Sequence, residues 1–594
     1  MFIHFRRAAL VLLAVVASLG AATAREPAPP ALASQHMAAT ANPMASEAAR
    51  AILRAGGSAV DAAIAAQMVL GVVEPQASGI GGGGFLLHYD ARSRRVTAWD
   101  GRETAPAGAT ERLFLDAEGK PLGFRDAVVS GLSIGVPGTV RMLEAAHRRH
   151  GKLPWADLFV PAIGLAENGF AMPPRLAAAL RAWPHVRADE QARAIFFAED
   201  GSPGTQGSIV RNPQLAATMR LIAGRGADGL HTGPLADAIA DTVRRQPRPG
   251  TLTTGDLAGY RPLARDPLCR PWREWTVCGM GPPSSGPLAI LQALAMLPAG
   301  SGIGDDPAVD AQTTRRPTSR PALAIADAHW LAETGRLIFA DRGRYLGDPG
   351  FVAVPVDGLL DPAYIADRTS LVRKDRALGK AEPGLPPGAP GGNAGDGTVK
   401  PERGTSHLSI VDRDGNVVSF TTTIEGPFGA GHFAGGFPLN NELTDFDFTP
   451  SVDGRPLANR VQAGKRPRSS MSPLIVLDRE GRFVLAIGSA GGARIVGNVL
   501  QATLAALAGN LPIQRAIDQR RVLNRNGVTE IEGGPDDAES LTLAAALGKL
   551  GPATTTAPHA GGLHGVRARR AADGTLLGYE GGADRRRDGA ALGD

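Results

Sequence analysis

The sequence of 594 residues predicts an α+β protein, because capped helices and strand–turn–strand pairs occur in one chain. The first half carries helix-start signals, each followed by an apolar run. The second half carries two apolar strands joined by an Asp-Gly-Asn turn at residues 414–416. The length can bury a large core, organised as one domain or as two or three.

The N-terminus has the features of an export signal. Residues 4–7 are basic, residues 8–19 are apolar, and residues 22–24 form a small-x-small cleavage site. The apolar run is too short and wrongly flanked for a stable membrane span, although an uncleaved signal acting as an anchor remains an alternative. We therefore predict a signal peptide over residues 1–24, no stable membrane span, and a periplasmic or secreted mature chain.

Two helices come next. Asn42-Pro43 supplies a cap residue and a first-turn proline for a helix that ends at Gly56-Gly57. Ser58 and Asp61 form a capping-box-like start for a second helix, which extends to about Leu70. These signals place two consecutive helices near the start of the mature chain.

In the central region the sequence predicts strands, then helices, and then an exposed linker that leads to Thr405. The glycines of residues 79–84 precede strand-like runs, and they lack the spacing of a phosphate-binding loop. Residues from about 135 to 380 are mostly helical, with Pro and Gly breaks. Residues 298–321 and 382–404 are typical of exposed insertions, and the second leads the chain directly to Thr405.

Thr405 stands at the leading edge of the strand pair formed by residues 406–412 and 417–423. A threonine hydroxyl is a poor nucleophile and needs an adjacent base. Cleavage just before the residue would free an α-amine with a pKa of about 8, which can act first as base and then as acid. The spacing alone is equally compatible with an ordinary strand threonine. Farther on, strands at 474–478 and 483–488 lead into an amphipathic helix that ends at Gly509.

The composition excludes several functions. The net charge of +5 is small for this length and the arginines are scattered, so we predict no nucleic-acid partner. The 12 histidines show no ligand pattern, so no metal is predicted. Cys269 and Cys278 flank a short segment, and they form either a hairpin disulfide in an oxidising compartment or two buried thiols.

Taken together, the motifs make the chain resemble the γ-glutamyltransferase (glutathione hydrolase) family of N-terminal-nucleophile hydrolases. The resemblance extends from about Met37 to Arg587. The segments that carry it are residues 81–85, 102–106, 282–286, 345–349, 405–407, 439–442, 465–473 and 488–492.

The resemblance implies a four-layer αββα fold, with two antiparallel sheets between helix layers. It also implies a precursor that cuts itself between Gly404 and Thr405. The products would be a large subunit, residues 25–404, and a small subunit, residues 405–594, which stay together as a heterodimer. No cofactor is implied.

The resemblance also assigns the reacting groups. Thr405 would be the nucleophile, and Thr423 would hydrogen-bond its freed amine; alone, Thr423 is an ordinary strand residue. The backbone N–H groups of Gly491 and Gly492, before a helix N-terminus, would stabilise a developing oxyanion. Without the resemblance, the two glycines indicate only a tight turn.

A γ-glutamyl group needs a cation for its α-carboxylate and anions for its α-ammonium. Arg102 can bind the carboxylate bidentately, and the hydroxyls of Ser469-Ser470 can donate to it. Glu442 and Asp445 can accept from the ammonium. Considered as an isolated pair, these two carboxylates are more typical of a solvated loop.

The sequence departs from the family in two places. Glu425 occupies a position where the family usually has Asn, and it can accept from an ammonium but repels a carboxylate. Residues 446–467, which correspond to a lid loop, contain no tyrosine and look short, which indicates a more open site.

The function expected from the resemblance is hydrolysis or transfer of γ-glutamyl groups through an ester on Thr405. Glutathione or another γ-glutamyl compound would be the donor, and water, an amino acid or a peptide the acceptor. Three alternatives remain: a cephalosporin (glutaryl) acylase on the same scaffold, a non-catalytic periplasmic binding protein, and a serine hydrolase.

Overall fold

The computed structural model describes residues 29–297, 323–390, 395, 397, 404–551, 553–559 and 561–594. The predicted signal peptide and the predicted insertion at residues 298–321 lie outside the described residues, as does most of 391–403. Within the described ranges, no helix is both long enough and apolar enough to cross a membrane.

Two seven-stranded sheets, antiparallel throughout, form the centre of the molecule. The first sheet has the order β23 (Ala590–Gly593), β2 (Met37–Thr40), β10 (Ser406–Val411), β11 (Val417–Thr423), β3 (Gly83–Asp90), β4 (Arg95–Asp100) and β7 (Leu263–Arg265). The second has the order β1 (Ala31–Ala33), β22 (Leu576–Ala583), β21 (Gly562–Arg570), β17 (Phe483–Ala490), β16 (Leu474–Leu477), β9 (Trp275–Gly279) and β8 (Leu268–Trp272).

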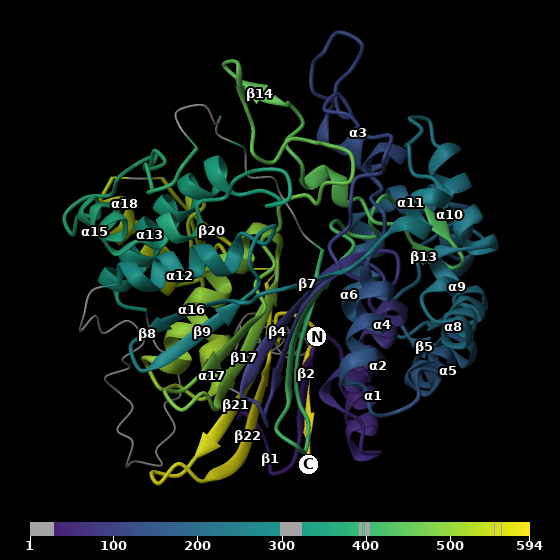
Figure 1. The fold of residues 1–594 in the computed structure, drawn as a ribbon, viewed down its shortest axis with the longest axis horizontal. Coiled ribbons are helices and arrows are strands. Elements are labelled where there is room, and N and C mark those ends of the chain that lie inside the picture. Colours follow the sequence, from purple (N-terminus) through teal and green to yellow (C-terminus); the bar gives the residue numbers. More distant parts are fainter. Residues whose placement is uncertain are drawn as a thin grey trace, which may run out of the picture.

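The two sheets lie between two helix layers (Figure 1). The first sheet is covered by α1 (Pro43–Arg54), α2 (Ala59–Val73), α4 (Thr139–His150), α5 (Val160–Asn168), α8 (Pro213–Arg225) and α10 (Pro234–Arg244). The second is covered by α12 (Gly286–Met296), α13 (Ile325–Tyr345), α16 (Ile495–Leu507) and α17 (Ile513–Asp518). The αββα arrangement expected from the resemblance is confirmed.

The remaining helices lie around these layers. They are α3 (Phe124–Val128), α6 (Pro174–Ala182), α7 (Glu190–Phe196), α9 (Asp228–His231), α11 (Thr254–Gly259), α14 (Val356–Leu359), α15 (Pro362–Ser370) and α18 (Ala538–Gly548). The prediction of a mostly helical region between about 135 and 380 is confirmed, with β7, β8 and β9 as its main strands.

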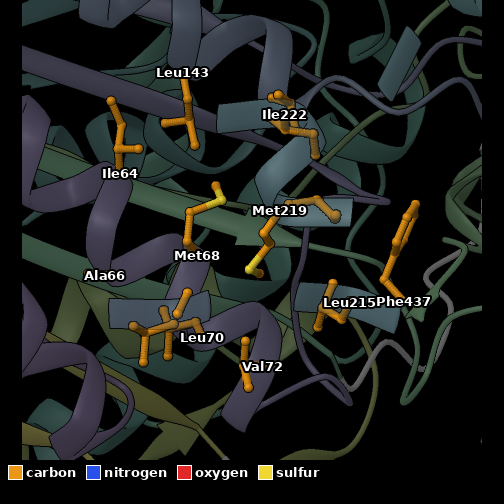
Figure 2. Close-up of a cluster of buried hydrophobic side chains, with 14 of the residues drawn as sticks. Ile64, Ala66, Met68, Leu70, Val72, Leu143, Leu215, Met219, Ile222 and Phe437 are labelled. Atoms are coloured by element: carbon orange, nitrogen blue, oxygen red, sulfur yellow. The ribbon is translucent and has the colours of Figure 1, made fainter. Parts of the chain in front are cut away.

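Helix α2 is buried on every side, and all 15 of its residues belong to the core. Its Ile64 and Met68 lie in one cluster with Leu143 of α4 and Met219 of α8 (Figure 2). The predicted capping box is present, because Ser58 and Asp61 bond each other's backbone N–H groups. The helix runs three residues beyond the predicted end at Leu70, since its apolar sequence continues there.

The β10–β11 hairpin places the two threonines of interest at one end of the first sheet. Ser406 pairs with Thr422, and Val411 pairs with Val417 across the predicted turn. Gly415 in that turn has a φ of 82°, a left-handed conformation that favours glycine. Because the strands are antiparallel, the start of β10 and the end of β11 coincide.

A disulfide joins Cys269 of β8 to Cys278 of β9, so the first of the two alternatives for these cysteines holds. The register of the hairpin sets the two residues directly opposite each other. Strand β9 also pairs with β16, and the chain then continues through residues 280–285 toward α12. The bridge therefore closes a hairpin at the edge of the second sheet.

Candidate active site

A narrow pocket lies where β10 begins and β11 ends. The residues that line it come from widely separated parts of the sequence: Arg102, Thr405, Thr423, Glu425, Glu442, Asp445, Ser469, Ser470, Met471 and Ile495. Eight of these ten are the nucleophile, its partner threonine and the substrate-binding residues expected from the sequence. The fold thus brings together in one place the residues that the motifs singled out separately.

Thr405 is buried and has an unusual backbone. Its φ is 101°, which β-branched residues rarely adopt. Its N–H donates to the carbonyl of Ala77 at 2.9 Å, and its carbonyl accepts from Nη1 of Arg587 at 2.8 Å. Its hydroxyl donates to Oγ1 of Thr423 at 3.3 Å. The backbone is therefore fixed on both sides while the hydroxyl lies in the pocket.

Thr423 and Glu425 hold the segment around the predicted cleavage point. Oγ1 of Thr423 accepts from the N–H of Glu425 at 2.8 Å, and the carbonyl of Glu425 accepts from the N–H of Gly404 at 2.8 Å. The carboxylate of Glu425 accepts from Nδ2 of Asn441, whose Oδ1 accepts from Gly426 N–H at 2.8 Å. Glu425 therefore contributes both to the pocket wall and to the position of Gly404.

Arg102 pairs directly with the two carboxylates that were expected to bind a substrate ammonium. Its Nη1 donates to Glu442 and its Nη2 donates to Asp445. The carbonyls of Pro467 and Arg468 accept from the same guanidinium at 3.2 and 3.1 Å. Sequence reasoning placed Arg102 and the two acids in one site, but it did not predict that they contact each other.

Burial changes the acidity of the carboxyls behind this ion pair. It raises the pKa of Glu442 well above the ordinary value, although the Arg102 guanidinium opposes the change. Burial also raises the pKa of Glu103 to about 7. Glu103 is fully buried next to Arg102 in sequence, so two acids close to the pocket favour their neutral forms more than exposed acids do.

Ser469 is held by the segment before α12, and Ser470 is held by an arginine of α13. The carbonyl of Ser469 accepts from the N–H and the hydroxyl of Ser285 at 2.8 and 2.6 Å. Nη2 of Arg342 donates to Oγ of Ser470 at 2.8 Å. The motif at residues 282–286 is therefore a support for the serine pair.

Gly491 and Gly492 form a turn between β17 and the start of α16 and are not among the residues that line the pocket. Their φ values are 121° and 60°, which favour glycine. Ile495, the first residue of α16, does line the pocket. The turn therefore lies only a few residues before Ile495, at the end of α16 that lines the pocket.

Sequence reasoning missed four contributors: Met471, Ile495, Ala77 and Arg587. Met471 lies inside a motif that was recognised, and Ile495 opens a helix that was predicted. Ala77 acts through its backbone carbonyl, which has no sequence signal. Arg587 belongs to a run of three arginines that is typical of a solvated surface.

The histidine that follows the nucleophile lies outside the pocket. His407 is buried between the sheets, where its ring nitrogens contact Oγ1 of Thr421 at 2.8 Å and Oγ of Ser409 at 3.0 Å. Burial lowers its pKa well below 6.5, so it is a poor base. In the part of the chain that the structure describes, no group of His, Cys, Asp and Glu is arranged to hold a metal ion.

The segment that corresponds to a lid contains the small hairpin of β14 (Ser451–Val452) and β15 (Arg455–Pro456), whose residues are exposed. At its base, Nδ2 of Asn459 donates to the carbonyl of Asp445 at 2.7 Å. The segment that carries the hairpin is thus tied to the pocket wall. The expectation of a more open site stays a prediction.

Two facing antiparallel sheets between helix layers, with a threonine at the head of a central strand, define an N-terminal-nucleophile hydrolase. A family model described as gamma-glutamyltranspeptidase matches residues 45–594, and the chain belongs to this family.

Relatives and solved structures agree with this assignment. The chain is 38% identical over 568 residues to a glutathione hydrolase proenzyme of Bacillus subtilis (strain 168), covering 94% of this chain and 91% of that protein. It is 35% identical over 558 residues to the acylase ACY 1 proenzyme of Pseudomonas sp. (strain SE83), covering 92% of each. The crystal structure of a cephalosporin acylase from Bacillus halodurans superimposes with a TM-score of 0.81 at 26% identity, covering 97% of this chain and 99% of that one.

Proposed function

We propose that this protein is a self-processing γ-glutamyl hydrolase and transpeptidase that acts through an ester on Thr405. The observation that carries the proposal is the position of the Thr405 hydroxyl. It contacts Thr423 in a pocket that also holds a guanidinium and carboxylates, the groups that a zwitterionic γ-glutamyl end requires.

In the first reaction, Oγ1 of Thr405 attacks the carbonyl carbon of Gly404. The C–N bond to Thr405 breaks, an ester to Oγ1 forms, and the nitrogen becomes an amine that carries the hydroxyl proton. Water then hydrolyses the ester and releases the carboxylate of Gly404. The positive φ of Thr405 supports this step, because such a conformation stores roughly 1–3 kcal/mol that cleavage can release.

The two products would remain associated. After a cut at this bond, β2, β3, β4 and β7 would belong to the large subunit, and β10, β11 and β23 to the small one. Strands of the two subunits are neighbours in one sheet, since β2 lies between β23 and β10 and β11 pairs with β3. Separation would therefore break backbone hydrogen bonds and open the core. This arrangement supports a stable heterodimer of residues 25–404 and 405–594.

In the second reaction, the freed amine of Thr405 takes the proton from Oγ1 as the oxygen attacks the γ-carbonyl of the donor. In this proposal the N–H groups of Gly491 and Gly492 stabilise the oxyanion. The amine then returns the proton to the leaving nitrogen, which departs as the amine product. Water or an amino group attacks the resulting ester, and glutamate or a new γ-glutamyl amide leaves.

Substrate recognition would use the ion-pair cluster. Arg102 and the hydroxyls of Ser469 and Ser470 would bind the α-carboxylate, while Glu442 and Asp445 would accept from the α-ammonium. Glutathione and related γ-glutamyl compounds fit these demands. We also propose that residues 1–24 are removed and that the mature protein acts in the periplasm or outside the cell.

A glutaryl acylase is the second candidate, and the similarity to an acylase and to a cephalosporin acylase favours it. A glutaryl group has no α-ammonium, so the carboxylates of Glu442 and Asp445 would have no partner on such a donor. Comparing hydrolysis of γ-glutamyl-p-nitroanilide with that of glutaryl-p-nitroanilide tests the choice. We expect preference for the first donor, and preference for the second would select the acylase.

The catalytic role of Thr405 is tested with Thr405→Ala, which should stay one chain and hydrolyse neither anilide. The matched control is Thr422→Ala, on the same hairpin but outside the pocket lining; it should be cut and active. An uncut wild type without activity would favour a binding protein. Fluorophosphonate inactivation without cleavage would favour a serine hydrolase.

A further inference from the structure

Arg587 makes a contact with the nucleophile that the proposed reaction does not use. It lies in the C-terminal segment before β23, and its guanidinium is buried. Nη1 donates to the carbonyl of Thr405 at 2.8 Å. The C-terminal end of the chain therefore reaches the residue whose amine is proposed to act as the base.

Thr405 is fixed from two directions. Its N–H bonds to Ala77, and its carbonyl bonds to Arg587. Because the nitrogen and the carbonyl carbon of one residue are joined through a single Cα atom, the guanidinium is close to the nitrogen that cleavage would free. A full positive charge at this distance disfavours a second positive charge on that nitrogen.

We propose that Arg587 is a positioning residue for the nucleophile, which holds the carbonyl of Thr405 and favours the unprotonated form of its freed α-amine. The inference rests on the proposed function, since it requires Thr405 to become an N-terminus. An unprotonated amine is the form that can accept the hydroxyl proton. The positive charge would thus keep the base ready at neutral pH.

Several charged groups face Arg587, and the acidic ones among them reduce the effect of its charge on the Thr405 amine. At the end of α2, Glu74 is buried and accepts from Nη1 of Arg175 of α6 at 3.3 Å and from the hydroxyl of Ser406 at 3.3 Å. Asp584 and Asp588 act on Arg587 from its own segment. Burial raises the pKa of Glu74, which weakens its negative charge.

Groups beyond this cluster leave the sign of the effect unchanged. Burial lowers the pKa of His564 of β21 to about 3, so it is neutral at working pH. Across the pocket, Arg102 is paired with Glu442 and Asp445. The carboxylate of Glu425 on the pocket wall favours the protonated amine, and the charge of Arg587 opposes it. Burial lowers the pKa of Arg587 to about 9, so its guanidinium is still charged near neutral pH.

The test is the pH dependence of kcat/KM for γ-glutamyl-p-nitroanilide, measured on the processed heterodimer. The acidic limb reports the base of the free enzyme. In Arg587→Gln the limb should move up by roughly one pH unit, because the charge that disfavours the ammonium is gone. In Arg587→Lys the charge remains, so the limb should stay in place while kcat falls. Arg336→Gln removes an equally buried arginine that bonds the carbonyls of Gly379 and Gly527, and it should not move the limb.

A second variant guards against failure of Arg587→Gln to fold. The double variant Glu74→Gln/Arg587→Gln removes the opposing buried carboxylate together with the guanidinium, and its limb should lie at higher pH than that of Glu74→Gln alone. A processed, active Arg587→Gln with the wild-type limb would overturn the inference and leave the proposed function intact. If Arg587→Gln is not recovered, equal limbs in the double variant and in Glu74→Gln overturn it. Failure of the proposed function is distinct, because the wild type would then lack cleavage.

Discussion

The substitution Glu103→Gln should stabilise the protein above neutral pH. Glu103 is fully buried, and Gly83 packs so closely that an added Cβ would lie 2.3 Å from its Oε2. Burial raises its pKa from 4.5 to about 7. The folded state therefore binds this proton more tightly than the unfolded state, and stability is lost as pH rises from about 4.5 through about 7. A glutamine keeps the shape and removes the ionisable group.

The shift from 4.5 to about 7 corresponds to a loss on the order of 3 kcal/mol. At about 2.1 cal/mol/K per residue, unfolding of the chain carries an entropy of roughly 1.2 kcal/mol/K, so 3 kcal/mol corresponds to about 2–3 °C in Tm. We expect the variant to match the wild type near pH 4.5 and to melt about 2–3 °C higher at pH 8, measured by scanning fluorimetry of the heterodimer.

The control for this prediction is Glu532→Gln. Burial opposes ionisation of Glu532, but the Arg586 guanidinium overcomes it and lowers the pKa to about 2. This carboxylate contributes stability that is present above pH 4.5, so its removal should lower Tm at pH 8. A Glu103→Gln variant whose Tm difference from wild type is the same at pH 4.5 and pH 8 would refute the reasoning about Glu103.

Two further predictions concern the pocket and the edge of the second sheet. Glu425→Gln should shift the ratio of kcat/KM toward glutaryl-p-nitroanilide, relative to γ-glutamyl-p-nitroanilide, by roughly three- to tenfold. The carboxylate repels the acid group of both donors but attracts only the ammonium of the second, so an unchanged ratio would exclude this role. The double variant Cys269→Ser/Cys278→Ser should lose roughly 2–3 kcal/mol of unfolding free energy and melt about 2 °C lower. The reason is that it removes a covalent loop between cysteines with a sequence separation of 9. Equal Tm values for this variant and the wild type under non-reducing conditions would contradict the expectation.

The sequence was most informative where local chemistry decides structure. Asn42-Pro43 and the Ser58–Asp61 box gave the starts of α1 and α2, because capping needs only neighbouring residues. The turn at 414–416 gave the register of β10 and β11, and hence the position of Thr405 opposite Thr423. Motifs shared with a known family then identified the pocket residues.

Contacts between distant residues could not be predicted in this way. The pairing of Arg102 with Glu442 joins positions 340 residues apart. The bond from Arg587 to Thr405 spans 182 residues. Such contacts depend on the orientation of side chains in the packed fold. The arginine run at 585–587 is typical of a surface. Only the folded structure shows that Arg587 is buried and bonds the nucleophile.

In the proposed enzyme, one peptide bond is cut and the new terminus supplies the base. N-terminal sequencing of the smaller fragment of the purified wild type shows whether this bond is cut. We expect a sequence that starts Thr-Ser-His-Leu, from Thr405 onward. A fully active protein that remains a single continuous chain would contradict it.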